Sequence, residues 1–239
     1  MATLLSSLET QARRHLLETT ASFWSSAELI DIVNLGIKDL WGSIVDLHQE
    51  HFLTVDISNV SLAASATQLS GVPADTFRVH LIEPTDTTSA GSFDNVQFVP
   101  KDYNSPEFIA ARTLSSTDPT SSGLIFYCLT TQGAPVAAPV VLTGPKLSSA
   151  MTAGSIRFVY VPTLAARVAA EANPIPGDSD NALIAWCVAY ARAKEREDRS
   201  PDSAWLAVYA TEKMNLMLRL TPRQDQEPSV VYPLFESLW

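Results

Sequence analysis

Apolar residues recur at helical spacing along the N-terminal part of the chain and predict two helices, over 4–20 and over about 26–50. In the second helix the apolar positions step by three or four residues, close to a heptad repeat. Ser25 and Glu28 are spaced as a capping box at its start. The apolar positions form one continuous seam, which we expect to make inter-helix or inter-subunit contacts through Val33, Ile37, Leu40, Trp41 and Ile44.

The residue pattern of the sequence changes near residue 53, where short β-prone runs replace the helical spacing. Segments rich in Ser, Thr, Pro, Asp and Gly separate these runs, as expected for turns and loops. Five or six antiparallel strands at this spacing indicate a small β-barrel or sandwich. The expected strands lie at 51–58, 76–83, 95–100, 124–131, 138–143 and 155–162.

Helical spacing returns after the Pro- and Gly-containing stretch 173–177. Asp178 or Asp180 is expected to cap a helix over about 181–197. Ser200 and Pro201 are expected at the N-cap and N1 positions of a further helix, which Thr221-Pro222 ends. The apolar side of the first of these helices is predicted at Leu183, Ile184, Cys187, Val188 and Ala191.

These elements predict an α+β fold, in which an N-terminal and a C-terminal helix pair form a helical bundle around an inserted β domain. An extended C-terminal arm follows, and its proline-broken sequence ends in aromatic and aliphatic residues that indicate docking on the chain itself or on a partner. The expected divisions are 1–52, 53–176, 177–221 and 222–239.

The charge is acidic along the whole chain, with 16 Lys and Arg against 26 Asp and Glu and a formal net charge of −10. Such a surface disfavours tight duplex binding, which needs clustered cations. The N-terminus lacks the features of a signal peptide, and no run approaches the length of a membrane span. We therefore expect a soluble protein with no membrane partner, and interpret Cys128 and Cys187 as small buried residues.

Motifs for catalysis or cofactor binding are missing from the sequence. There is no Gly-x-Ser-x-Gly elbow, Walker loop or dinucleotide-binding glycine motif, and the acidic residues are dispersed. His48 and His51 lie three residues apart but lack an evident third metal ligand. We therefore expect no enzyme activity, no cofactor and no metal, although dispersed catalytic residues would escape this search.

Several motifs occur in a fixed order over roughly 23–215. They are Phe23-Trp24-Ser25-Ser26-Ala27-Glu28-Leu29-Ile30-Asp31-Ile32-Val33-Asn34, Asp39-Leu40-Trp41, Val72-Pro73-Ala74-Asp75-Thr76-Phe77-Arg78-Val79, Arg157-Phe158-Val159-Tyr160-Val161-Pro162, Asn181-Ala182-Leu183-Ile184, and a helix around Trp205 and Tyr209. This ordered set resembles the head-to-tail adaptor (connector) proteins of short-tailed and related bacteriophages. Val33 and Val72-Pro73 depart mildly from the family pattern, which has isoleucine and Leu-Pro there.

The resemblance implies a structural virion protein, made in the host cytoplasm and located in the neck. It implies a ring, typically of twelve copies, that docks beneath the portal, holds tail, nozzle or tail-fibre proteins, and passes genomic DNA without sequence-specific binding. By the same resemblance the C-terminal extension grips the portal. The portal-interface residues would be Tyr232, Leu234, Phe235, Leu238 and Trp239.

Three other functions stay open at this point. The chain could be a different phage neck protein, such as a stopper or tail-completion protein. It could be a cytoplasmic module whose β-barrel holds a small ligand in a central pocket. It could also be an enzyme whose catalytic residues are dispersed in sequence.

Overall fold

The computed structural model of the protein describes residues 3–18, 23–85, 96–114, 123–131, 139–176, 178–196 and 200–221. The chain divides into two compact units. The helical unit comprises 1–48 and 166–239, and the β unit comprises 49–165. The protein is therefore of mixed α+β class, as the sequence predicts.

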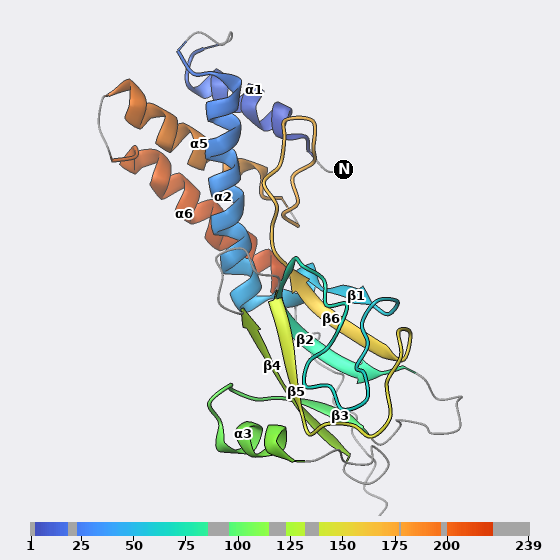
Figure 1. Cartoon of the computed structure of the whole chain (residues 1–239). Helices are drawn as coiled ribbons and strands as arrows, with labels where there is room; N and C mark the ends of the chain where they lie inside the picture. The colour runs from blue at the N-terminus through green and yellow to red at the C-terminus, as the bar shows by residue number, and fades with distance from the viewer. Residues whose placement is uncertain are drawn as a thin grey trace, which may run out of the picture. The chain divides into compact units, whose positions relative to one another are not determined.

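The helical unit contains α1 (Leu5–His15), α2 (Ser26–Leu47), α5 (Asp180–Glu195) and α6 (Ser203–Leu220) among its described residues. Helices from both ends of the chain pack together, with α5 in contact with α1, α2 and α6 (Figure 1). All four helices were expected from the apolar spacing, but α1 is shorter at its C-terminal end than the expected helix over 4–20. The capping box of Ser25 and Glu28 is confirmed.

The core of the helical unit lies between α2 and α5. The α2 seam is buried along its length, and so is the predicted apolar side of α5. At the centre of this contact the indole ring of Trp186 lies against the backbone of Gly36. A Cβ atom on residue 36 would lie only 2.8 Å from Trp186 Cδ1, so this position requires glycine for close helix contact.

A buried charged cluster fixes the end of α1, which apolar spacing alone does not predict. The Arg13 guanidinium bonds Glu9 at 2.9 Å and Glu18 at 3.1 Å, and donates to the carbonyl of Trp24 at 3.0 Å. Trp24 in turn donates through its indole N–H to the carbonyl of Ala191 at 3.1 Å. The connection between α1 and α2 is thereby tied to α5.

The predicted caps of the two C-terminal helices are wrong. The N-cap of α5 is Ser179, whose hydroxyl accepts from the Asn173 amide at 2.8 Å instead of capping the helix. The N-cap of α6 is Asp202, whose carboxylate accepts from the backbone N–H groups of the first turn. A carboxylate is a stronger acceptor for these groups than the Ser200 hydroxyl two residues earlier.

The divisions between the units differ from the expected 52/53 and 176/177. Residues 166–176 lie with the helical unit because their backbone bonds to it: Leu5 donates to the carbonyl of Glu171 at 3.0 Å. The Asn34 side chain likewise bonds the backbone of Arg167 in both directions, at 2.8 and 2.9 Å. The short 3₁₀ helix η1 (Gln49–Phe52) lies with the β unit, where the end of the second helix and the start of the strand over 51–58 were expected.

The β unit contains two three-stranded sheets among the described residues, and every expected strand is confirmed. The first sheet has the order β1-β6-β2 and the second β3-β4-β5. The strands are β1 (Thr54–Asp56), β2 (Thr76–Pro84), β3 (Gln97–Pro100), β4 (Leu124–Thr131), β5 (Pro139–Gly144) and β6 (Ile156–Pro162). The prediction of antiparallel pairing throughout is wrong, since β3 pairs with β4 in parallel. The described strands form no closed barrel, so the predicted barrel is not confirmed.

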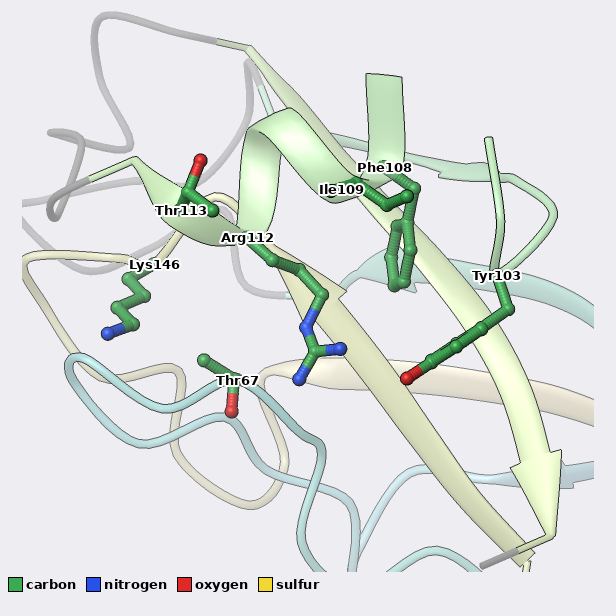
Figure 2. A pocket seen from close by; sticks show the side chains of 7 residues that line it. All are labelled: Thr67, Tyr103, Phe108, Ile109, Arg112, Thr113 and Lys146. Carbon is green, nitrogen blue, oxygen red and sulfur yellow. The ribbon is translucent and has the colours of Figure 1, made fainter. Parts of the chain in front are cut away.

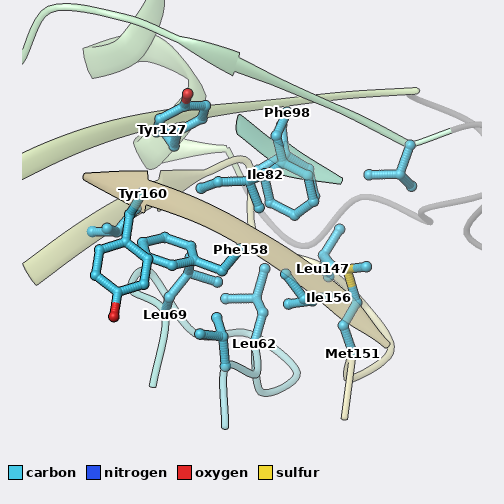
Figure 3. Close-up of a cluster of buried hydrophobic side chains, with 14 residues drawn as sticks. Leu62, Leu69, Ile82, Phe98, Tyr127, Leu147, Met151, Ile156, Phe158 and Tyr160 are labelled. Atoms are coloured by element: carbon cyan, nitrogen blue, oxygen red, sulfur yellow. The ribbon is translucent and has the colours of Figure 1, made fainter. Parts of the chain in front are cut away.

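The two sheets contribute to one hydrophobic core, which Figure 3 shows around β6. Phe158 and Ile156 of β6 are fully buried at its centre. Val159 and Val161 on the opposite face of β6 are buried as well.

An additional helix, α3 (Pro106–Thr113), lies in the β unit and was not predicted. Ser105 caps it by accepting from the Phe108 N–H, and Pro106 opens its first turn. Phe108 is fully buried. Gly144 at the end of β5 lets the α3 backbone approach, because a Cβ there would lie 2.9 Å from the backbone nitrogen of Arg112.

We predict that Gly36→Ala destabilises the helical unit by about 1–3 kcal/mol, because the added methyl group overpacks the contact with Trp186. Gly42→Ala is the matched control in the same helix, where nothing lies within 4 Å of the added Cβ. That variant should be neutral or stabilising by up to about 1 kcal/mol. Urea unfolding measures both, and equal effects of the two substitutions would contradict the packing described here.

Candidate protein-contact surface

Helix α6 presents an exposed, uncharged stripe along one face, which we call the α6 stripe. Its central side chains are well exposed, Met214 at 60% and Leu218 at 69%. The opposite face of α6 is buried through Tyr209 and Leu216. Residues spaced by three and four positions share one helix face. The α6 stripe consists of Ala207, Thr211, Met214 and Leu218, flanked by Ala204, Val208 and Ala210.

A polar cluster on α2 and α6 holds the stripe outward. The Asp39 carboxylate on α2 accepts a hydrogen bond from the Tyr209 hydroxyl and pairs with the Lys213 ammonium at 2.6 Å. Burial opposes ionisation of Asp39, but the Lys213 and Tyr209 hydrogen bonds hold the pKa of its carboxyl below the ordinary value. Burial and the neighbouring carboxylate raise the pKa of Tyr209. The tyrosine therefore stays a neutral donor, and the rotation of α6 about its own axis is set.

The predicted seam residues lie together on the buried side of α2, and the chain itself covers them. The exposed fraction of each is 8% or less. Contacts between helices of one chain therefore account for the seam, and its side chains are not presented to a neighbouring subunit. The residues concerned are Val33, Ile37, Leu40, Trp41 and Ile44.

The predicted portal-interface residues lie outside the described part of the chain. They are Tyr232, Leu234, Phe235, Leu238 and Trp239. Sequence reasoning missed the α6 stripe. The signal was present in the spacing of Ala207, Thr211, Met214 and Leu218, but spacing does not reveal which apolar face of a helix stays exposed.

Candidate metal ligands and nucleophiles form no cluster among the residues that the structure describes. No group of three or more His, Cys, Asp or Glu side chains there could hold a metal ion. His48 instead lies 3.2 Å from the Thr221 hydroxyl. Cys187 is buried, as expected, and burial raises the pKa of its thiol to about 12, so it stays protonated at neutral pH. Cys128 is only half-buried.

A pocket of about 400 Å³ lies beside α3 in the β unit. It opens next to Arg112 and Lys146, away from the shared core of the two sheets, which is filled by side chains. The ligand-binding-barrel hypothesis expected a pocket inside a barrel, and the described residues place this one elsewhere.

No helix in the described part of the chain is long and apolar enough to cross a membrane. No protein-family model matches the sequence, and no curated protein matches it.

We predict that Asp39→Asn lowers the free energy of unfolding by on the order of 1 kcal/mol at pH 7, since the pair is partly exposed. A carboxyl whose pKa is lowered by folding stabilises the fold above its ordinary pKa of 3.8. That stabilisation is lost as the pH falls through the lowered value. The difference between wild type and variant should therefore be largest at neutral pH and shrink in acid.

Urea unfolding at pH 7 and below pH 3.8 measures this difference. Asp178→Asn is the control, because its pair with Arg219 at 3.5 Å is highly exposed and should contribute little. A difference between wild type and Asp39→Asn that does not change with pH would rule out a role for the ionised carboxylate.

Proposed function

We propose that this chain is a non-catalytic structural protein that acts through contacts with other protein subunits, as the head-to-tail adaptor of a tailed bacteriophage. The α6 stripe is the observation that carries the first half of this proposal. An exposed, uncharged face on an otherwise acidic chain is typical of a surface that another protein covers. The resemblance described from the sequence supplies the second half.

The arrangement of the chain supports the adaptor. The family that the sequence resembles typically places its helices around the channel and a β-rich domain outside, and this chain has a helical unit and a β unit for these two roles. In the proposal the helical unit forms the ring, typically of twelve copies, and the α6 stripe contacts the neighbouring copy. The β unit, with its two sheets as a sandwich, faces tail, nozzle or tail-fibre proteins.

The charge supports passage of DNA through such a ring. A net charge of −10 gives the genome no extended cationic surface to adhere to. The DNA would therefore slide past the subunits without sequence-specific contact during ejection. The virion neck, between portal and tail, is the location that this role requires.

The role of the α6 stripe is tested by the double variant Met214→Asp, Leu218→Asp. Two charges on the stripe should reduce ring formation on the portal protein of the same genome by more than tenfold, because a covered carboxylate would lose its hydration. Ring occupancy is counted by electron microscopy of portal complexes. Leu17→Asp, at an almost fully exposed position of the same unit, should leave occupancy unchanged.

Thermal unfolding of the free chain checks that the double variant is folded, which is expected because both side chains are exposed. Full ring occupancy by a folded double variant would show that the α6 stripe does not contact the neighbouring copy.

The role of the C-terminal segment is tested separately. Deletion of 228–239, or Phe235→Ala with Trp239→Ala, should weaken binding to portal rings by at least tenfold, because aromatic anchors dominate interface energies. Asp225→Ala with Gln226→Ala, just before the deleted residues, is the control. Sedimentation with purified portal rings measures the binding, and unchanged binding of the truncated chain would show that the segment is not a portal anchor.

A further inference from the structure

The charged side chains that line the pocket beside α3 are all cationic. Arg112 of α3 and Lys146, just after β5, contribute two cations, and no acidic side chain lines the pocket in the described residues. This lining contrasts with the acidic composition of the chain as a whole. The hydroxyl-bearing side chains Thr67, Tyr103 and Thr113 complete its polar part.

The Arg112 guanidinium has no hydrogen-bond or ion-pair partner among the described residues. Its Nε is buried without a hydrogen bond, and no ion pair involves its other nitrogens. Arg157 in the same unit instead pairs with Glu83 at 2.8 Å. Figure 2 shows the Arg112 side chain extending between Thr67 and Tyr103, along the wall of the pocket. Its remaining donors are therefore available to an anion from outside.

The geometry around Arg112 is fixed before any ligand arrives. Gly144 permits the close approach of the α3 backbone to β5, and the buried Phe108 ring anchors the helix. The Arg112 guanidinium lies 5.9 Å from the centre of that ring, within the range of a cation–π contact. A preorganised guanidinium loses little conformational entropy when it binds a carboxylate through two parallel hydrogen bonds.

The remainder of the pocket selects for an apolar group next to the anion. The apolar part of the lining includes Ile109 and the ring of Tyr103, which are exposed, together with the buried Phe108. Tyr103 is 51% exposed and Ile109 is 53% exposed, so both offer apolar surface beyond the cavity itself. Tyrosine and arginine are the side chains that dominate interface energies, and this combination fits a protein partner better than a small ion.

We propose that this pocket receives an acidic side chain, flanked by aromatic residues, from a partner protein. The carboxylate accepts from Arg112 and is attracted by Lys146, while the neighbouring aromatic groups cover Ile109 and Tyr103. Charge complementarity identifies this occupant, since a cationic pocket on an acidic chain favours an anion that arrives with its own apolar contacts. The inference rests on the proposed function only in assigning the β unit to the attachment of tail proteins.

The test uses the full chain and the blocked peptide acetyl-Phe-Glu-Phe-amide, titrated with detection by NMR. Saturable binding is expected, with shifted resonances at the pocket. The peptide with Gln in place of Glu should bind about tenfold more weakly, because the charge-assisted hydrogen bonds are lost. Equal binding of the two peptides, or no binding of either, would overturn the proposal.

Arg112→Gln and Lys146→Gln should each weaken binding of the Glu peptide, Arg112→Gln by about tenfold. Arg157→Gln removes the same charge elsewhere in the β unit and should leave binding unchanged. Thermal unfolding identifies any variant that fails to fold. If Arg112→Gln does not fold, Lys146→Gln tests whether the cations of the pocket bind the peptide, since Lys146 lies outside the helices and strands.

Two further ligands show whether the pocket prefers a peptide carboxylate to a small organic acid or to phosphate. Phenylacetate and inorganic phosphate should each bind at least tenfold more weakly than the peptide, because neither covers both Ile109 and Tyr103. Equal or tighter binding of phenylacetate would make this a small-molecule pocket, and equal binding of phosphate an unselective anion site. Either result overturns the peptide assignment without bearing on ring formation, which is measured with portal complexes.

Discussion

The packing of α2 on α5 is the contact on which the rest of the helical unit depends. These two helices come from opposite ends of the chain, before and after the β unit, and the buried seam of α2 joins them. Gly36 sets how closely they approach, because the Trp186 ring occupies the space of a side chain. This contact buries the seam inside the unit, while Met214 and Leu218 of α6 stay exposed.

The orientation of α6 follows from polar contacts added to this core. Tyr209 and Lys213 both bond Asp39, which turns the charged and aromatic side of the helix inward. Met214 and Leu218 then face outward. An exposed apolar stripe costs solubility unless it is covered, which is why the proposed function assigns it to a contact with a neighbouring copy. In the proposed ring, the net negative charge of each copy would oppose association of free subunits before they reach the portal.

Apolar spacing predicted the helices and strands because each element buries a face with its own period. It did not reveal α3, whose eight residues give too short a pattern, although Ser105-Pro106-Glu107 carries the signal of a helix start. It also did not reveal the parallel pairing of β3 with β4, since strand direction depends on contacts distant in sequence.

The candidate sites were harder to predict than the fold. The seam residues were expected to serve contacts within or between subunits, and the same spacing suits both. Only the tertiary structure shows that they are buried, in a helix that packs on α5 and α1 of the same chain. The pocket beside α3 carries no motif, because Thr67, Arg112 and Lys146 are far apart in sequence and meet only in the folded β unit.

The most direct test of the proposed adaptor role is an electron-microscopy reconstruction of the neck of tailed virions produced from the genome that encodes this chain. The proposal predicts a ring of copies beneath the portal, with Met214 and Leu218 of one copy covered by the next. A neck reconstruction that lacks this protein would contradict the assignment.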